Sequence, residues 1–369
     1  MDSQKTLHNY GIDLLKITAM FLVLLLHILG HGGILGKLMS TSPELLSKYG
    51  MAWLLEIIAY CSVNCFALIT GYNYYGKKPP WSNLINLLFQ IIFYSSIITV
   101  IFLLSGEKIT YNIWIKTFFP VLGTYNWYIT SYAGMFIFIP MMNKFLDTTN
   151  MKDLKTFLFI LFIWFSFLPT VFALDPFRLV NGYSMLWLCI LYLLGGTIRK
   201  YSLNKLLDGD KALIYFIIII LVSWLLKISI DNINIFIDGK IVYGSRFIKY
   251  ISPLIVGSSV FIFIYFANLN IKNNFIIKFI KLSVPTYFGI YIIHLHPIIW
   301  NKYIKNCAVS FVQSNCIVMI MKIFLTAILI YITLSFIDYL RLKLFDYLSV
   351  NNQIKNFCNK IEVILQSKI

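Results

Sequence analysis

Long apolar stretches separated by short polar ones follow each other along almost the whole chain of 369 residues. Most are about 18 to 24 residues long, the length a helix needs to cross about 30 Å of hydrocarbon. Because lipid permits helices but no open strand edges, each stretch is predicted to be a helix. The predicted spans are residues 12–30, 51–71, 83–105, 126–143, 156–174, 182–198, 212–230, 247–267, 284–303 and 317–340. The pattern therefore predicts an all-α, polytopic membrane bundle of about ten transmembrane helices.

Composition excludes a soluble protein. The chain is 59% hydrophobic and only 12% charged, whereas soluble domains have about 25% charged residues. No linker, repeat or low-complexity segment interrupts the pattern. We therefore expect one membrane domain over residues 1–345, followed by a cytoplasmic tail over residues 346–369.

The net charge of +16 raises the question of nucleic acid binding. The basic residues are spread over short loops and form no patch with interleaved aromatic side chains, so membrane topology explains them better. Their bias predicts a multi-pass protein of the cell membrane with both termini in the cytoplasm. The first span lacks a small-residue cleavage pattern, so we interpret it as a retained signal anchor rather than a signal peptide.

Most of the six cysteines lie inside or beside apolar runs without metal-type or disulfide-framework spacing. We interpret them as buried thiols. Cys307 and Cys316 flank one short loop, so a disulfide between them is an alternative if that loop faces an oxidising compartment.

The first span contains polar residues that need an explanation. Burying an ionisable group within a span costs free energy, so each such residue is a candidate for a functional role. Lys16 and His27 are eleven residues apart, about 16 Å along a helix axis, which puts the cation near the cytoplasmic surface and the imidazole past the middle of the membrane. A snorkelling Lys16, an Asp13 that complements the helix dipole, and a structural His27 are the simpler alternatives.

His31 follows His27 by four residues and shares its helix face, as a pair of metal ligands would. No third ligand is evident, so we predict no metal site. Gly32 and Gly33 are expected to end the helix and expose His31 to the outer side.

The first span resembles the membrane-bound acyltransferase type 3 family. Residues 13–16 (Asp-Leu-Leu-Lys) and Leu26-His27 are similar to its first-span signature of an Asp, two apolar residues, an Arg, and a His eleven positions later.

Three later stretches resemble the same family in the same order. They are residues 62–72 (Ser-Val-Asn-Cys-Phe to Thr-Gly-Tyr), residues 126–140 (Asn-Trp-Tyr-Ile to Ile-Pro) and residues 287–294 (Tyr-Phe-Gly-Ile-Tyr-Ile-Ile-His). The resemblance thus covers essentially the whole chain.

This resemblance implies an O-acetyltransferase-like enzyme that moves an acyl group, commonly acetyl, from cytoplasmic acyl-CoA to a hydroxyl of a cell-surface glycan such as an exopolysaccharide. Acyl-CoA is then a co-substrate, and no permanently bound cofactor is expected. His27 is implied as the catalytic base or transient acyl carrier, and Lys16 takes the place of the donor-site Arg. Lys keeps the charge but lacks the planar fork that suits phosphate.

Lys77 and Lys78 stand in the loop where many family members carry an Arg-rich motif. As point charges they are candidates for donor binding. The alternative is that they only determine topology.

The remaining site candidates each have a structural alternative. Glu56 is a candidate to orient His27, or a water-facing structural carboxylate. Asn64 is interpreted mainly as a hydrogen-bonding contact between helices, and Trp127 as an interfacial anchor, with substrate stacking left open. His294 and His296 point in different directions on a helix, so we expect at most one of them at the site.

Two other functions fit a bundle of this kind. A flippase or other glycan transporter also places polar residues in mid-membrane, and an envelope glycan polymerase shares many spans and aromatic loops. The four resembling stretches favour acyl transfer over both. The sequence indicates no oligomeric state.

Overall fold

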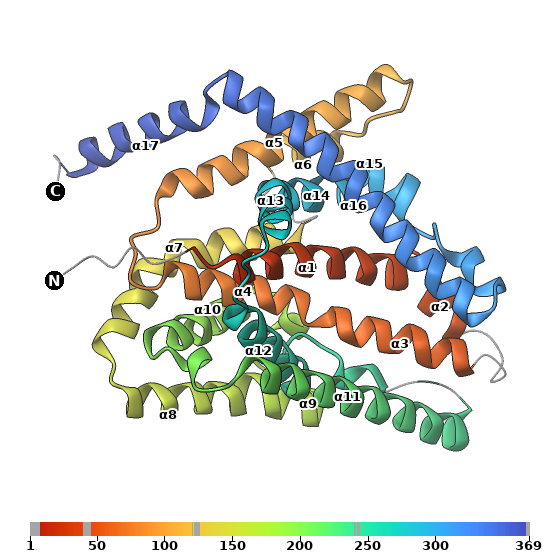
Figure 1. Cartoon of the computed structure of the whole chain (residues 1–369). Helices are drawn as coiled ribbons and strands as arrows, with labels where there is room; N and C mark the ends of the chain where they lie inside the picture. Colours follow the sequence, from red (N-terminus) through yellow and green to blue (C-terminus); the bar gives the residue numbers. More distant parts are fainter. Residues whose placement is uncertain are drawn as a thin grey trace.

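The protein is a bundle of helices, and no strand occurs in the residues that the structure describes (Figure 1). The computed structural model describes residues 8–39, 46–119, 121, 126–239, 241 and 244–366. The α-helices are α1 (Tyr10–Leu26), α2 (Ile34–Met39), α3 (Leu46–Tyr60), α4 (Ser62–Tyr74), α5 (Trp81–Leu104), α6 (Tyr111–Phe118), α7 (Trp127–Thr148), α8 (Met151–Phe162), α9 (Leu168–Phe172), α10 (Met185–Lys200), α11 (Gly209–Asp238), α12 (Pro253–Asn268), α13 (Asn274–Ser283), α14 (Tyr287–His294), α15 (Pro297–Ile299), α16 (Cys316–Tyr347) and α17 (Val350–Gln366). The predicted all-α fold is confirmed.

Several of these helices can cross a membrane, so the chain is a multi-pass membrane protein. Seven helical stretches in the described residues are long and apolar enough: Tyr10–Met39, Lys48–Tyr74, Trp81–Leu104, Met151–Phe172, Gly209–Ile237, Asn274–His294 and Cys316–Tyr347. The shorter α12 is also apolar, and α7 and α10 cover the two other predicted spans. Every predicted span thus contains a helix, while the number of about ten crossings stays a prediction.

The first span lies in the middle of the bundle. In its most apolar window 67% of the residues are buried, against 17% in the corresponding windows of α11 and α16. Large apolar side chains such as Leu225 on α11 and Leu329 on α16 are exposed, as expected for helices that face lipid. A polar side chain on α1 therefore points into protein or into a cavity.

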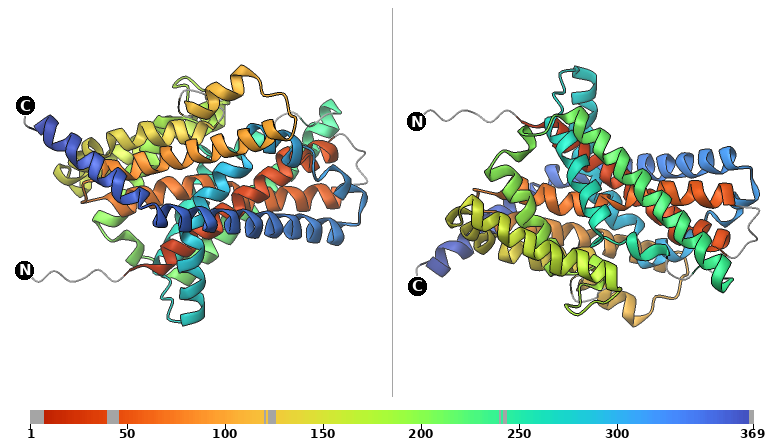
Figure 2. Two further views of the ribbon diagram at one scale, coloured as in Figure 1. Left: turned by 90° about the horizontal axis from the view of Figure 1, so that it is seen from above. Right: turned by 90° about the horizontal axis from the view of Figure 1, so that it is seen from below.

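The two ends of the bundle are distinguished by where the chain begins and ends. The chain enters α1 and leaves through α17 at one end, at the left of Figure 1, and the views in Figure 2 agree. We call this the proximal end and the opposite one the distal end. α17 packs against α5 and follows directly on α16.

Helices α4 and α10 pack closely because glycines lie at their contact. A methyl group at Gly71 would lie 2.1 Å from the Tyr192 carbonyl oxygen, and one at Gly195 would lie 2.2 Å from the Leu68 carbonyl oxygen. Small residues at such contacts let helix backbones approach in lipid, where the hydrophobic effect does not drive association. This contact fixes α4, which forms one wall of the site.

A buried ion pair connects α11 to α3. Lys227 and Asp231 form a salt bridge on α11, and each is 1% exposed. The Tyr49 hydroxyl donates to Asp231 at 2.6 Å, and the Lys227 ammonium lies 4.0 Å from the centre of a Trp53 ring. Partners from α3 thus surround a charge pair that would otherwise be costly within a span.

Two breaks in helical geometry lie at the site residues. After α1 the chain forms a π-helical turn, η1 (His27–His31), in which the Gly32 amide donates to the His27 carbonyl at 2.7 Å. Gly33, at φ +89°, ends this turn, and His31 is exposed. The predicted span over residues 284–303 is also interrupted, since α14 ends at His294 and α15 begins at Pro297. Pro297 explains this break, because proline has no amide proton for a helix interior.

Candidate active site

His27 is hydrogen-bonded to a second histidine from the other end of the sequence. His27 Nδ1 lies 2.8 Å from His294 Nε2, and His294 Nδ1 lies 2.7 Å from the Ile290 carbonyl oxygen. His294 is fully buried at the end of α14. The two imidazoles and the carbonyl therefore form one hydrogen-bonded chain.

This chain determines which nitrogen of His27 is free. A carbonyl oxygen only accepts, so His294 Nδ1 carries a proton and, in a neutral ring, His294 Nε2 is the acceptor. His27 Nδ1 must then donate to it. The lone pair of His27 is consequently on Nε2, the nitrogen that a base or nucleophile needs.

His27 lies where two cavities meet. One, which we call the proximal cavity, has a volume of about 430 Å³ and is also lined by Lys16. The other, which we call the distal cavity, has about the same volume and is also lined by His31. Leu26, Trp127, Tyr250 and Tyr291 line both cavities as well. Each volume is in the usual range for ligand sites. The ring thus borders both cavities.

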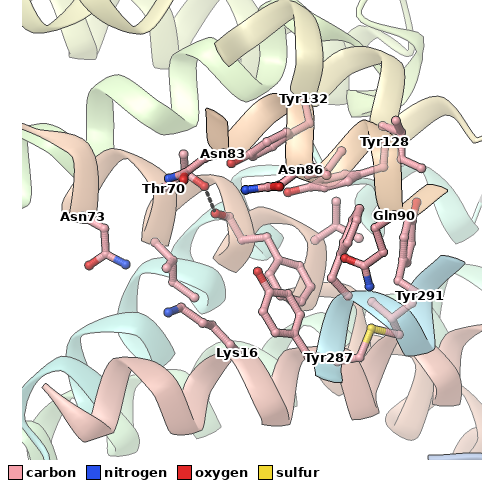
Figure 3. Close-up of a pocket in the computed structure, with 18 of the residues that line it drawn as sticks. Lys16, Thr70, Asn73, Asn83, Asn86, Gln90, Tyr128, Tyr132, Tyr287 and Tyr291 are labelled. Atoms are coloured by element: carbon pink, nitrogen blue, oxygen red, sulfur yellow. Dashed lines mark hydrogen bonds between the residues drawn. The ribbon is translucent and has the colours of Figure 1, made fainter. Parts of the chain in front are cut away.

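Polar side chains from α1, α4, α5, α7 and α14 line the proximal cavity (Figure 3). Lys16 points into it from α1, with Thr70 and Asn73 on α4 and Tyr287 on α14 nearby. Lys16 Nζ donates to Asp13 Oδ1 at 2.7 Å. The polar lining residues labelled in Figure 3 are Lys16, Thr70, Asn73, Asn83, Asn86, Gln90, Tyr128, Tyr132, Tyr287 and Tyr291.

Asp13 holds Lys16 in place and has a second partner. Its Oδ2 lies 2.5 Å from His8 Nε2, and the residue is buried. The Asn9 side chain caps α1 by accepting from the Ile12 amide at 3.1 Å. Asp13 therefore acts mainly as the partner of two basic side chains, in addition to its expected position in the first helical turn.

Aromatic side chains dominate the distal cavity. The indole of Trp300 packs edge-on against His27 and His31, with ring centres 5.2 and 4.7 Å away. The ring centres of Trp127 and Tyr183 lie 4.6 Å apart. Trp127 is therefore a wall residue of both cavities and not only an interfacial anchor.

Two polar groups in the distal cavity have no partner. Within the described residues, Glu56 Oε2 and Asn126 Nδ2 are buried without a hydrogen bond, and both residues line this cavity. The oxygen of the same amide, Asn126 Oδ1, accepts from the Tyr291 hydroxyl at 2.6 Å. An unpaired buried polar group costs about 1–3 kcal/mol, which a bound ligand would relieve.

Of the two alternatives for Glu56, the pairing with His27 does not occur among the described contacts. His294 occupies the Nδ1 side of His27 instead, and Glu56 faces the distal cavity. Periodicity predicts which face of its own helix a side chain occupies, but not which distant helix packs against that face.

Three other candidates have separate positions: Asn64 and His296 bond to other groups, and the ring centre of His31 lies 5.8 Å from that of His27. Asn64 donates to the Tyr250 carbonyl at 2.9 Å and accepts from the Trp187 indole at 3.1 Å, so it joins helices. His296 caps α15 and contacts the Thr99 hydroxyl at 3.3 Å. His31 lines the distal cavity.

Lys77 and Lys78 are exposed in the loop between α4 and α5, and neither lines the proximal cavity. Lys78 Nζ lies 3.9 Å from Glu362 Oε2 on α17. Their part in donor binding stays a prediction.

Sequence reasoning missed several residues of the site. Tyr291 and Trp300 were not singled out, although Tyr291 belongs to the motif that ends at His294. Arg341 was counted only as one of the basic residues at the end of the last span, yet it lines the proximal cavity. The available signal for it was the spacing of Asp338 and Arg341, which repeats that of Asp13 and Lys16.

The fold and the site define a multi-pass membrane protein with an imidazole that lines two cavities. Residues 9–339 match the family model described as an acyltransferase domain. The chain belongs to this acyltransferase family, which confirms the resemblance seen in the sequence. No curated protein and no solved structure matches the chain.

Proposed function

We propose that this protein transfers an acetyl group from acetyl-CoA to a hydroxyl of a cell-surface glycan at the cell membrane. The observation that carries the proposal is the position of His27, which lines both cavities while its Nδ1 is bonded to His294. In this arrangement a donor enters from the proximal end and an acceptor from the distal end. Membership of the acyltransferase family supports the type of reaction.

The proximal cavity suits the donor. Lys16 supplies a positive charge for a phosphate, and side-chain amides further along the wall suit the peptide-like arm that carries the thioester. Asn86 Oδ1 is buried there without a partner among the described residues. An amide N–H of the donor arm would satisfy it.

The free Nε2 of His27 is suited to general-base catalysis. As the acceptor oxygen attacks the thioester carbonyl, its proton moves to Nε2, and the positive charge that forms is shared with His294 through the Nδ1 hydrogen bond. When the C–S bond breaks, the imidazolium returns this proton to the leaving sulfur. The products are an acetyl ester and CoA thiol.

The same nitrogen also permits a two-step route. Nε2 attacks the thioester carbonyl, the thiolate leaves and takes up a proton, and an acetyl-imidazole remains on His27. The acceptor hydroxyl then attacks this carbonyl from the distal cavity, loses its proton and forms the ester. Brief incubation with radiolabelled acetyl-CoA in the absence of acceptor leaves label on the protein only in this route.

The distal cavity suits a polyhydroxylated acceptor. Aromatic rings with a few polar groups are typical of a small-molecule site, and here the polar groups are Glu56 and Asn126, each with an unpaired atom. A carboxylate oxygen that accepts and an amide that donates can hold two hydroxyls of one sugar. Trp127 and Trp300 offer flat apolar surfaces for the ring.

The direct test is mass spectrometry of the surface glycan from cells with and without the gene. We expect acetyl esters in the wild type, their loss in the deletion strain, and their return when the gene is restored. Identical glycans in all three strains would refute the proposed acceptor. A glycan of changed chain length with unchanged ester content would indicate a polymerase instead.

A further inference from the structure

A second aspartate–cation pair, Asp338 and Arg341, places its cation in the lining of the cavity that Lys16 also lines. On α16, Arg341 follows Asp338 by three residues, and its Nη2 lies 2.8 Å from Asp338 Oδ2. Both cations line the proximal cavity. Arg341 lies just beyond residues 9–339, so the family match does not include it.

Asp338 is fully buried, and both of its carboxylate oxygens accept hydrogen bonds. Its Oδ1 accepts from Gln90 at 3.1 Å, from the Tyr94 hydroxyl at 2.7 Å and from Arg341 Nε at 3.0 Å. Together with the bond from Nη2 to Oδ2, these contacts hold the guanidinium by two parallel bonds. The plane of Arg341 is therefore fixed before any ligand binds.

A glycine makes room for this carboxylate. A methyl group at Gly289 on α14 would lie 2.1 Å from Asp338 Cγ. Gly289 is five residues before His294 on the same helix segment, so the packing that brings Asp338 against α14 also involves the helix that carries the histidine pair. Asp338 thus packs against the helix that carries His294 and also binds Arg341.

Structural support alone does not explain an arginine that borders the cavity. Well-packed apolar residues often stabilise as much as a buried ion pair does. Two of the five N–H donors of the guanidinium bind Asp338, and the other three belong to the same rigid fork. Such a fork suits phosphate oxygens, and a lysine ammonium lacks this geometry.

We propose that Arg341 is a phosphate-binding residue for the nucleotide part of the acyl donor, with Asp338 as its positioning residue. This inference rests on the proposed function. Arg341 provides from α16 the guanidinium that is missing on α1, where Lys16 replaces the expected Arg. The group that Arg341 binds is a phosphate of acetyl-CoA. S-acetylpantetheine has the same thioester but no phosphate, so its use does not depend on Arg341.

The test compares these two donors with the full-length protein in lipid nanodiscs. The acceptor is surface glycan extracted from cells that lack the gene, and kcat/KM is measured for each donor. The main variant is the double substitution Asp338→Asn with Arg341→Gln, which removes both charges together and leaves no unpaired carboxylate. Arg341→Lys keeps the charge but not the fork. Arg199→Gln is the matched control, because Arg199 is at the proximal end, is exposed and does not line the cavity.

We expect the double variant to lose about 10- to 100-fold in kcat/KM for acetyl-CoA, as for a lost charged hydrogen bond, with the value for S-acetylpantetheine unchanged. Arg341→Lys should lose less, and Arg199→Gln should behave as the wild type. An equal loss for both donors, or an unchanged preference for acetyl-CoA, would overturn the role of Arg341 while the wild-type activity still supports the proposed function. A wild-type protein that uses neither donor would overturn the proposed function itself.

Discussion

His27 Nδ1 and His294 Nε2 lie 2.8 Å apart although 267 residues separate them in the sequence. Among the described contacts, the other ring nitrogen of His294, Nδ1, has one acceptor, the carbonyl oxygen of Ile290 on the same helix. This fixed carbonyl orients His294, and His294 in turn orients His27. The reactive nitrogen is therefore set by the backbone of α14.

Replacing His294 tests this relationship. His294→Ala removes the acceptor for His27 Nδ1, so the imidazole of His27 can rotate and change tautomer; we expect kcat to fall by about 10²-fold or more, with a smaller change in KM for either substrate. His294→Gln returns an amide oxygen near the former Nε2 position and should recover part of the loss. Steady-state kinetics in nanodiscs measures both.

His296 provides the control for this experiment. It is buried two residues away but caps α15 and does not contact His27. We expect His296→Gln to affect thermal stability more than kcat. Equal losses of kcat in the His294 and His296 variants would show that the break after α14, rather than the imidazole pair, is what matters.

Replacing His27 tests the chemistry itself. His27→Ala and His27→Gln should abolish glycan acetylation, since a general base contributes about 10²- to 10⁴-fold, and both proteins should still accumulate in the membrane. Immunoblotting of membranes and mass spectrometry of the glycan give the two measurements. A transporter without bond chemistry would export as much glycan in both variants as in the wild type. The ester content of that glycan would then not depend on His27.

The sequence predicted the parts of the site that lie within one helix. Lys16 and His27 stand out because a polar residue in an apolar span is costly, and their spacing gives their depths. The partner of His27 was not predictable in this way. Glu56 was one candidate partner, whereas His294 is brought in by the packing of α14 against α1.

Arg341 shows a different difficulty. A basic residue near the proximal end of a span is what topology alone requires, so its pattern in the sequence is the same whether or not it binds a ligand. Only the three-dimensional arrangement shows that Asp338, Gln90 and Tyr94 meet at one carboxylate beside the cavity. The presence of a helix in each span, in contrast, follows from the apolar runs and was predictable.

Glu56 is predicted to bind the acceptor. Glu56→Gln keeps the size of the side chain but replaces one carboxyl oxygen by an amide nitrogen, so we expect KM for the glycan to rise about 10-fold, the effect of a lost buried hydrogen bond, with KM for acetyl-CoA unchanged. Glu107→Gln is the matched control, because Glu107 pairs with Lys302 outside both cavities. A rise in KM for the donor instead would contradict the assignment of the distal cavity to the acceptor.

The buried pair on α11 is predicted to matter for stability. Lys227→Met leaves Asp231 charged and without its cation in the interior, which typically costs about 3–5 kcal/mol. The double variant Lys227→Met with Asp231→Leu removes both charges and should recover most of this loss. Thermal unfolding in detergent, followed by size-exclusion fluorescence, compares the three proteins. If the single and double variants unfold at the same temperature, the charge of Asp231 is not the cause.

The predicted orientation in the membrane can be tested at Cys307. This thiol is exposed in the loop between η8 (Trp300–Ile304) and η9 (Val309–Gln313) at the distal end, and the Asn306 amide beside it donates to the His31 carbonyl at 2.9 Å. With both termini in the cytoplasm, a membrane-impermeant maleimide should label Cys307 in intact cells. Lys77→Cys, at the proximal end, should react only after permeabilisation, and Cys307→Ser is the blank. The assay uses a Cys316→Ser background, because Cys316 is partly exposed nearby.

The pH dependence of this labelling follows from the surroundings of the thiol. Partial burial raises the pKa of Cys307 above its ordinary value of 9.0, and the thiolate is the reactive form. At neutral pH only a small fraction is therefore ionised, so the rate should be lower than for a fully solvated cysteine and should keep rising as the pH approaches and passes 9. A rate that levels off below this pH would mean that the loop is more open than the contact with His31 indicates. Labelling of Lys77→Cys in intact cells, with Cys307 protected, would reverse the orientation and place the donor cavity on the outside, where no acetyl-CoA is available.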